Sequence, residues 1–314
     1  DSGIKSDIKS NINKNTKPGN INFTAKELGH EYLGHIIENK VITYCLYKKL
    51  EQKHNIDIIT GSIINLDNNN KNIELDNNYS IFYDLLIAAD GVNSWIRKKL
   101  DIETSFKDYE QQACVCTVQT ENNLNKCAWQ RFLPTGPLAF LPFNQNTASI
   151  VWSQDNIKSE QTKQLNNKDF EIELTKQCEN KLGKIKLLSP RAYFPLTRQH
   201  AKTYTQDNIA LIGDAAHRIH PLAGQGANIG ILDAVALKDN IQKAINKSRK
   251  YYTLNWLKKY EQTRWFANQN MMLSMSGFNL LFSNNNYLYE KLRTHGLNLA
   301  NKSHAFKNLC SRTF

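Results

Sequence analysis

One continuous stretch, residues 208–233, constrains the fold more than any other part of the chain. It reads NIALIGDAAHRIHPLAGQGANIGILD. The apolar run at 209–212 is typical of a buried parallel strand, and the small residues after it predict a tight turn that carries one carboxylate, Asp214. A helix with glycines at its start follows, with apolar residues at Ile229, Leu232 and Val235. Glycines let a ligand approach the backbone and a helix N-terminus offers unpaired N–H groups, so this order predicts a ligand-binding strand, turn and helix.

A second strand end has the same layout. Residues 83–89 form an apolar run that ends in Asp90 and Gly91, and Asn93 or Ser94 then caps a helix. Two such strand ends in one chain are what a doubly wound sheet needs to enclose a nucleotide at its carboxyl edge. The expected fold class is therefore α/β.

Residues 103–204 differ in character from the segments on either side. A helix is expected near 167–182, and turn-forming residues separate several runs of alternating apolar and polar residues. These runs lie at 114–118, 128–133, 138–143 and 149–152. The pattern predicts an antiparallel lobe, an α+β insert between the two nucleotide-binding strand ends.

Four parts follow from these patterns. We expect residues 1–102 to form the first part of the nucleotide-binding domain, 103–204 the antiparallel lobe, 205–245 the second part of that domain and 246–314 C-terminal helices. Within the first part, residues 1–30 are expected to be irregular and 32–39 to form a short strand, followed by a helix that Asn39 caps. Three alternating runs between 56 and 81, parted by Asn- and Asp-rich turns, predict an antiparallel meander.

Composition and net charge limit the classes of partner that the chain is expected to bind. The net charge of +11 is spread along the chain instead of gathered in a basic patch, which disfavours nucleic acid and leaves an anionic membrane surface as a candidate partner. No signal peptide is expected, and no apolar run reaches the roughly 18 residues that a membrane span needs. The six cysteines lack CxxC spacing and are expected to be reduced thiols. His217 and His220 lie three apart, but no metal site is predicted.

Four segments together resemble one family. GHIIEN, DLLIAADGVNSWIRKKL, WQRFLPTGPLAFLPF and GDAAHRIHPLAGQGANIGILD are similar to segments of the FAD-dependent hydroxylases of ubiquinone biosynthesis, of the p-hydroxybenzoate hydroxylase class of aromatic monooxygenases. The match keeps its order from about residue 29 to near the end of the chain. It implies an FAD-binding doubly wound sheet of that type, with the antiparallel lobe binding substrate and helices at the C-terminus.

The resemblance also implies roles for individual residues. Pro221, Gly224 and Gln225 would lie at the reacting flavin ring. The cofactor-binding residues would be Glu38, Asn39, Asp90, Gly91, Arg97, Gly213, Asp214, Ala216, Gly224, Gly226, Ala227 and Asn228, with Asp214 at the ribityl hydroxyls. The wall facing the phenol ring and its polyprenyl tail would include Trp129, Phe132, Pro137 and Phe140.

The implied chemistry is hydroxylation of the aromatic ring of a polyprenylphenol. NAD(P)H would reduce FAD, and O2 would add to form a flavin C4a-hydroperoxide. The implied location is the cytoplasm with peripheral attachment to a bacterial inner membrane, or the matrix face of the mitochondrial one. Membership of a ubiquinone-biosynthesis complex is a further expectation.

One departure from the family pattern leaves an alternative open. The family opens with a strand, a GxGxxG turn and a helix that hold the FAD pyrophosphate, and this sequence contains no GxGxxG. We therefore expect an N-terminally truncated form of the sheet. The alternative functions are a non-catalytic accessory subunit of the biosynthetic complex and an FAD enzyme that oxidises another aromatic compound or prenyl lipid.

Overall fold

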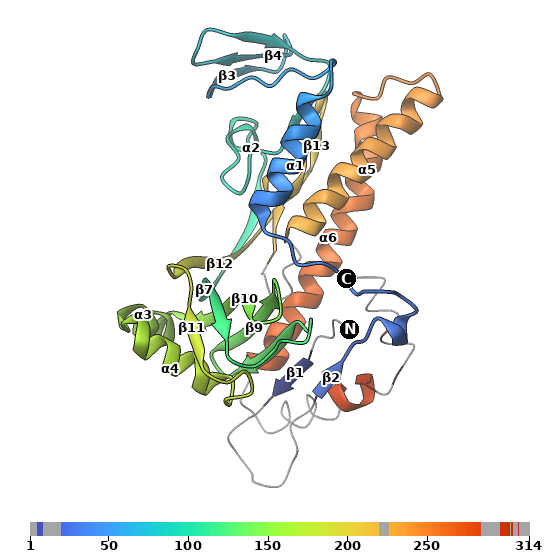
Figure 1. Ribbon diagram of the computed structural model, residues 1–314. Coiled ribbons are helices and arrows are strands. Elements are labelled where there is room, and N and C mark those ends of the chain that lie inside the picture. The colour runs from blue at the N-terminus through green and yellow to red at the C-terminus, as the bar shows by residue number, and fades with distance from the viewer. Residues whose placement is uncertain are drawn as a thin grey trace. The chain divides into compact units, whose positions relative to one another are not determined.

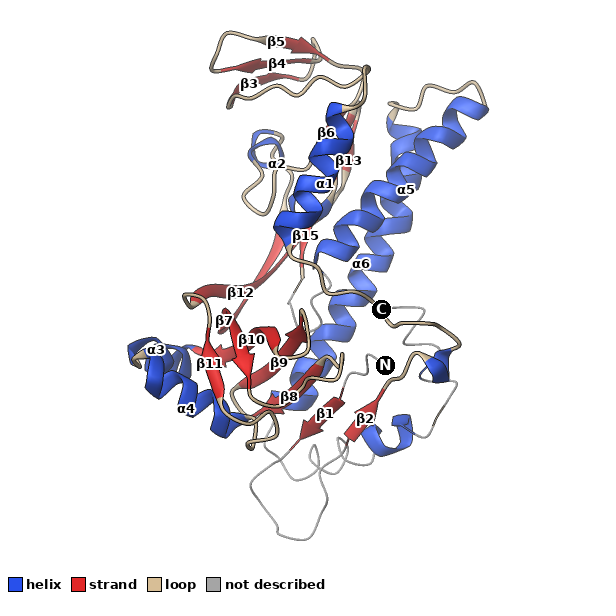
Figure 2. Cartoon of the chain, in the orientation of Figure 1, coloured by secondary structure: helices blue, strands red, loops and turns tan. Residues whose placement is uncertain are grey.

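The computed structural model describes residues 5–8, 20–219, 226–283, 296–301, 303 and 307. The chain forms two compact units, each made of separate segments (Figures 1 and 2). The first unit contains Asp1–Lys49, Glu110–Leu196 and Gly277–Phe314. The second unit contains Leu50–Tyr109 and Thr197–Ser276.

The first unit is built on antiparallel strands in the order β7, β10, β9, β8, with the short strands β1 and β2 beyond β8 and with β11 paired to β7. Its strands are β1 (Lys5–Ile8), β2 (Asn20–Asn22), β8 (Trp129–Leu133), β9 (Gly136–Pro142), β10 (Thr147–Asp155) and β11 (Ile185–Leu187), with the later part of β7 (Thr104–Thr120) and the earlier part of β12 (Ala192–Ala201). Its helices include η1 (Lys26–Leu28), α1 (Asn39–Glu51), α3 (Asn156–Gln164) and α4 (Asn167–Gln177).

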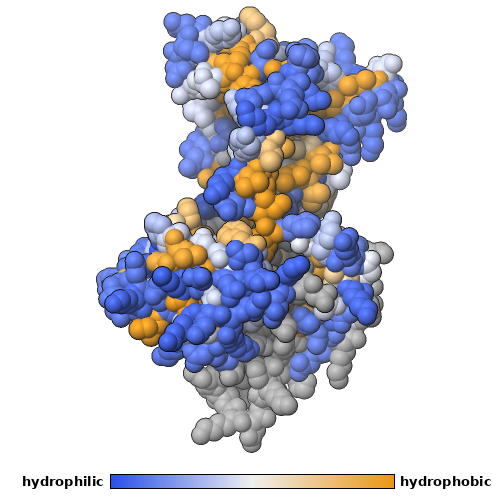
Figure 3. Space-filling view, in the orientation of Figure 1, coloured by the Kyte–Doolittle hydropathy of each residue, from blue (hydrophilic) through white to orange (hydrophobic). Residues whose placement is uncertain are grey.

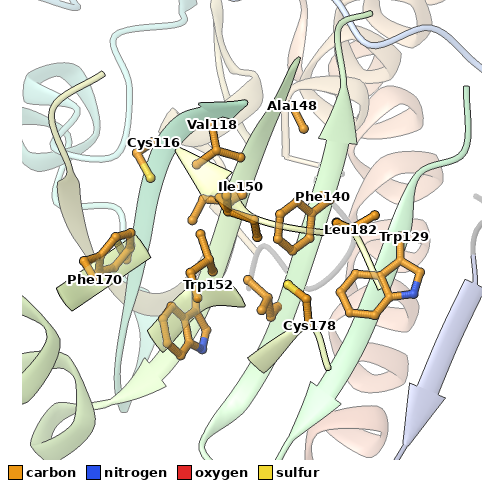
Figure 4. Close-up of a cluster of buried hydrophobic side chains, with 14 of the residues drawn as sticks. Cys116, Val118, Trp129, Phe140, Ala148, Ile150, Trp152, Phe170, Cys178 and Leu182 are labelled. Atoms are coloured by element: carbon orange, nitrogen blue, oxygen red, sulfur yellow. The ribbon is translucent and has the colours of Figure 1, made fainter. Parts of the chain in front are cut away.

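Alternation along the strands of the first unit separates a core face from an outer face. Phe140 lies opposite Ile150 and Leu138 opposite Trp152, and all four side chains are buried. Helix α4 adds Phe170, whose ring centroid lies 6.1 Å from that of Trp152. Figure 4 shows these side chains gathered in one cluster. The antiparallel pairing of β7, β10, β9 and β8 confirms the predicted antiparallel lobe.

The second unit contains a short parallel pair of strands, β6 (Leu86–Ala88) and β14 (Ile209–Leu211), with β13 (Thr205–Gln206) antiparallel to β14. A separate antiparallel meander is confirmed where the Asx-rich turns predicted it. The remaining elements of the unit are β3 (Ile63–Asp67), β4 (Asn72–Leu75), β5 (Ser80–Phe82), α2 (Trp95–Lys99), η2 (Gly213–Ala215), β15 (His217–Arg218), α5 (Gly226–Asn246) and most of α6 (Leu254–Ser283).

The core of the second unit lies between the parallel strands and the long helices. Ile209, Ala210 and Leu211 are fully buried, as expected for strands covered on both faces. Leu237 of α5 and Tyr260 of α6 pack in the same cluster. The Tyr260 hydroxyl donates a hydrogen bond to the Leu211 carbonyl at 2.8 Å, which satisfies the polar end of a buried ring.

Two local expectations for the first part of the chain are wrong. Residues 32–39 are not a strand, because no described neighbouring strand offers them backbone partners. Residues 5–8 and 20–22 were expected to be irregular, yet they form β1 and β2, and β1 pairs in parallel with β8. The reason is that backbone pairing with an existing sheet edge decides these short segments, and it leaves little trace in side-chain pattern.

The surface combines polar cover with exposed apolar residues. Hydrophilic residues cover most of the face in Figure 3, and apolar residues gather in patches. No residue of α1 is buried, although it carries Val41, Ile42 and Leu46. Within the described ranges, none of the helices combines the length and the hydropathy required to cross a bilayer.

We predict that Gly136→Ala destabilises the first unit. Gly136 has φ +139°, and an added Cβ would lie 2.4 Å from the carbonyl oxygen of Ser153, a backbone atom of β10 that cannot move aside. Overpacking and backbone strain together should lower the free energy of unfolding by about 2–4 kcal/mol. Urea unfolding measures this. Gly34→Ala is the control, since nothing lies within 4 Å of its added Cβ, and equal losses in both variants would contradict the prediction.

Candidate cofactor site

Parallel pairing brings the two predicted turns to one edge of the second unit. Ile209 lies opposite Leu86, and Leu211 opposite Ala88. The Ile212 N–H continues the pairing with a 3.0 Å hydrogen bond to the Ala88 carbonyl. Because parallel strands end at the same edge, the turn after β6 and the turn after β14 are neighbours.

Each turn depends on a glycine in the left-handed region. Gly91 has φ +82° and Gly213 has φ +58°. The carboxylates beside them, Asp90 and Asp214, are exposed. Asp90 accepts a 3.2 Å hydrogen bond from the Ile96 N–H at the start of α2. Two exposed carboxylates therefore stand at the edge where a polar ligand could reach them.

Arg97 connects the two turns through hydrogen bonds to their backbone carbonyls. Its guanidinium donates to the Ala215 carbonyl and to the Val92 carbonyl, both at 2.7 Å, and the side chain is buried. Ser94 caps α2, since its hydroxyl accepts a hydrogen bond from the Arg97 N–H at 3.0 Å. This bond holds the backbone from which the Arg97 side chain extends. Burial lowers the pKa of Arg97, and the charge of Asp90 opposes this shift. Arg97 thus bonds the backbone of both turns.

Helix α5 starts beside the same turn. An added Cβ on Gly230 would lie 3.3 Å from the Gly213 Cα, so the helix and the turn approach closely. Gly226 begins the helix with open space around its Cβ position, and Ala227 and Asn228 are exposed. The first N–H groups of a helix have no intrahelical partner. The predicted residues Pro221, Gly224 and Gln225, with His220, lie outside the described residues.

Asp233 of α5 forms a buried ionic centre behind the turn. Its Oδ2 accepts from the Gly213 N–H at 3.0 Å and from His217 Nε2 at 2.5 Å, and its Oδ1 accepts from Arg264 Nε at 2.7 Å. The carboxylate is fully buried. Burial raises its pKa, but the hydrogen bonds and charges of His217 and Arg264 outweigh this and hold the pKa below its usual value.

The buried network continues to β12 and α6. Asn268 Nδ2 lies 3.4 Å from Asp233 Oδ1 and donates to the Tyr204 hydroxyl at 3.1 Å. His200 Nδ1 lies 2.9 Å from Gln269 Oε1, and its Nε2 lies 2.7 Å from the Tyr204 oxygen. Since Gln269 Oε1 only accepts, the geometry assigns the proton to Nδ1, and Tyr204 donates to Nε2. The imidazole is therefore neutral.

Local sequence patterns do not reveal this network. Asp233 had one detectable signal, since it sits four residues after Ile229 and four before Leu237 on an apolar helical stripe. A carboxylate on such a stripe implies a buried partner. Its partners come from distant segments, and nothing in the local sequence around Arg264 marks it.

Two predicted cofactor residues belong to the other unit. Glu38 and Asn39 lie in the first unit and are exposed, and Glu38 forms a 2.7 Å ion pair with Lys40. Ala216, in contrast, is buried directly behind the Asp214 turn, and its N–H donates to the Gly213 carbonyl at 2.9 Å. The roles predicted for these residues stay predictions.

The four predicted substrate residues divide between the two faces of the β8–β9 hairpin. Trp129 lies opposite Phe140, and their ring centroids are 5.5 Å apart on the buried core face. Phe132 lies opposite Pro137, one residue out of phase with the first pair. Side chains alternate along a strand, so this second pair lies on the other face of the hairpin, where Phe132 is half-buried and Pro137 is buried. The two pairs lie on opposite faces of one hairpin, and the substrate role of all four residues stays a prediction.

The described part of the chain also bears on two other kinds of site, a metal site and a surface cavity. Its His, Cys, Asp and Glu side chains include no group of three or more arranged to hold a metal ion. A surface cavity of about 580 Å³ lies in the first unit, lined by residues such as Lys163, Ser189, Arg191 and Tyr193. None of the predicted site residues lines it.

The fold defines the class of protein. Residues 65–273 match the family described as FAD binding domain. The solved structure of p-nitrophenol 4-monooxygenase from Pseudomonas putida is similar with a TM-score of 0.75 at 13% identity, covering 98% of this chain and 79% of that one. A probable FAD-dependent monooxygenase from Pseudomonas aeruginosa is similar with a TM-score of 0.67 at 16% identity, covering 95% and 81%. The fold is that of the FAD-dependent monooxygenases.

Relatives of higher identity narrow the class. The 3-demethoxyubiquinol 3-hydroxylase of Escherichia coli is 36% identical over 288 residues, which are 91% of this chain and 73% of that protein. The mitochondrial ubiquinone biosynthesis monooxygenase COQ6 of Caenorhabditis elegans is 32% identical over 321 residues, 88% and 71%. The chain belongs to the FAD-dependent hydroxylases of ubiquinone biosynthesis. The resemblance and the fold class expected from the sequence are thereby confirmed.

We predict that Arg97→Lys destabilises the second unit by about 1–3 kcal/mol. A lysine keeps the charge but cannot reach both the Ala215 and Val92 carbonyls, so one buried acceptor loses its partner. Urea unfolding of the variant measures the loss. Lys98→Gln, an exposed change on the same helix, is the control and should stay within about 0.5 kcal/mol of the parent.

We also predict a pH dependence from His200. Burial, aided by the nearby His217, lowers the pKa of His200 to about 4, against an ordinary value near 6.5. As pH falls, the unfolded chain therefore binds a proton at this imidazole before the folded chain does. The free energy of unfolding keeps the full His200 contribution above pH 6.5 and loses it between about pH 6.5 and 4. Between pH 7 and 4 the parent should lose up to about 3 kcal/mol more stability than His200→Gln.

Urea unfolding across that pH range gives the comparison. His54→Gln removes an imidazole from an exposed loop and should follow the parent curve. A His200→Gln curve with the same pH slope as the parent would refute the assignment of a neutral buried ring.

Proposed function

We propose that this chain hydroxylates the aromatic ring of a polyprenylphenol intermediate in ubiquinone biosynthesis, using FAD, NAD(P)H and O2. The observation that carries the proposal is the position of two turns, Asp90–Gly91 and Gly213–Asp214, at one parallel sheet edge beside the start of α5. Identity of 36% with a protein named 3-demethoxyubiquinol 3-hydroxylase supports the substrate class.

The polar groups and the open backbone at this edge fit the ribityl and ring end of FAD. Asp214 offers an exposed carboxylate to sugar-type hydroxyls. The Cβ positions of Gly91 and Gly226 face open space, so the backbone at both places can be approached closely. When bound, FAD supplies the activation of oxygen, and the protein binds, orients and excludes water.

Each group of residues would have its own task in this chemistry. Asp214 would hold the cofactor chain, and the N-terminal N–H groups of α5 would stabilise negative charge at the pyrimidine edge of the ring. Arg97 would keep the two turns at a fixed separation through the Ala215 and Val92 carbonyls. Phe132 and Pro137 would contact the substrate from the face of the β8–β9 hairpin that lies opposite Trp129 and Phe140.

The proposal includes a location at a membrane surface. A polyprenyl tail is apolar and resides in lipid, and the net charge of +11 favours contact with anionic headgroups. The relatives include a bacterial protein and proteins named mitochondrial, so the membrane would be the bacterial inner membrane or the mitochondrial inner membrane. Association with other proteins of the pathway completes the proposal.

We predict that Asp214→Ala weakens FAD binding at least tenfold. A carboxylate that accepts hydrogen bonds from hydroxyl groups contributes about 1.5–3 kcal/mol, and a tenfold change corresponds to about 1.4 kcal/mol. Quenching of FAD fluorescence on titration with protein gives the dissociation constant. Asp239→Ala, an exposed position on α5, is the control and should bind like the parent.

Activity tests the reaction itself. The parent protein with FAD, NAD(P)H and a short-chain polyprenylphenol should yield a product one oxygen heavier by mass spectrometry, and Asp214→Ala should yield less at limiting FAD. A parent protein that binds FAD but oxidises a different aromatic compound would replace the substrate assignment. A parent protein that stays colourless after incubation with FAD would refute the enzymatic proposal.

A further inference from the structure

The strongest unassigned feature is the buried carboxylate of Asp233. An apolar residue at this position would continue the stripe of Ile229 and Leu237 that packs α5 into the core. The chain instead buries a charge and surrounds it with donors from η2, β15 and α6. Replacing a buried ionic group with well-packed apolar residues is often neutral or stabilising, so stability alone does not account for it.

The donors show what this carboxylate fixes. Oδ2 accepts from the Gly213 N–H at 3.0 Å, and Gly213 is the left-handed residue directly before Asp214. Three residues before Asp233, Gly230 lets the helix approach the Gly213 Cα closely. Helix α5 therefore contacts the turn twice, once by steric fit and once by a hydrogen bond to the backbone.

The other partners hold the carboxylate itself. Arg264 Nε bonds Oδ1 at 2.7 Å, and its Nη2 lies 3.4 Å from the Ile229 carbonyl. His217 Nε2 bonds Oδ2 beside Gly213. The carboxylate is thus held from both sides, and its Oδ2 can serve as a fixed acceptor for the turn.

We propose that Asp233 is a positioning residue for the cofactor, which locks the Gly213–Asp214 turn onto α5 and so sets the place of the Asp214 carboxylate relative to the start of that helix. The inference rests on the proposed function, since Asp214 and the start of α5 are there assigned to the ribityl chain and the ring. One carboxylate in the core would then align two ends of one cofactor site.

The first experiment compares FAD affinity in three single variants of the full chain. Asp233→Asn should raise the FAD dissociation constant at least tenfold, because an amide cannot accept from every donor around it. Arg264→Lys keeps a cation at Oδ1 and leaves the Oδ2–Gly213 bond, so its FAD affinity should stay within threefold even where its stability falls. Asp239→Asn, exposed on α5, controls for a change of charge on the same helix.

A second variant separates positioning from folding. Asp233→Leu combined with Arg264→Met removes the buried carboxylate and its guanidinium partner together and extends the apolar stripe, and a cooperative thermal transition establishes that the variant folds. Its FAD dissociation constant should still rise at least tenfold, because the Gly213 N–H has lost its acceptor. A folded double variant that binds FAD within threefold of the parent would overturn the inference and leave the proposed function standing.

Hydrogen exchange without FAD provides a readout that does not depend on the cofactor. The amides of 213–215 should exchange at least ten times faster in Asp233→Asn than in Asp239→Asn, while the amides of the first unit's strands keep their rates. Unchanged exchange at 213–215 would refute positioning. Faster exchange there, together with failure of the parent to bind FAD, would instead refute the proposed function.

Discussion

The parallel pairing of β14 with β6 is the interaction on which the site depends. It aligns Leu211 with Ala88, so that both strands end together and their two glycine turns become neighbours. Without that register, Asp90 and Asp214 would be unrelated surface carboxylates. Arg97 then donates hydrogen bonds to carbonyls of both turns. These bonds hold the two turns at a fixed distance from each other.

The exposed groups of the site face the ligand, and buried contacts hold those groups in position. At the surface its described residues offer two carboxylates and open space next to Gly91 and Gly226, so their geometry must be set from within. Buried ionic contacts supply that setting from α5, α6 and β15. An exposed site assembled on turns needs such support, because turns alone hold their shape weakly.

The local architecture of the site could be predicted from sequence, and its supporting contacts could not. The run at 209–212, the turn and the helix after it appear where the pattern placed them, since each depends on neighbouring residues. Asp233, Arg264 and His200 meet only through tertiary structure. Leu232 and Val235, expected on the apolar stripe of α5, are exposed, because the buried stripe runs through Ile229, Asp233 and Leu237 instead.

The alternation of side chains along β8 explains why the predicted substrate residues lie on two different faces. Trp129 and Phe132 differ by three positions on one strand, so they point to opposite faces wherever β8 is placed. That separation was available from sequence alone. Which of the two faces helices cover was not, because it depends on how α4 packs against the sheet.

The insertion of strands β7–β12 between β6 and β14 affects the entropic cost of pairing β6 with β14. Ile87 and Ala210 pair across a loop of about 120 residues, and closing such a loop is entropically costly. The ends of the insert are themselves joined, since the Lys202 N–H donates to the Glu103 carbonyl at 2.8 Å. Once the insert has folded, roughly 20 residues remain to be closed, which lowers the entropic cost by about 1–2 kcal/mol. Folding of the inserted strands before the parallel pair therefore makes closure of the cofactor edge less costly.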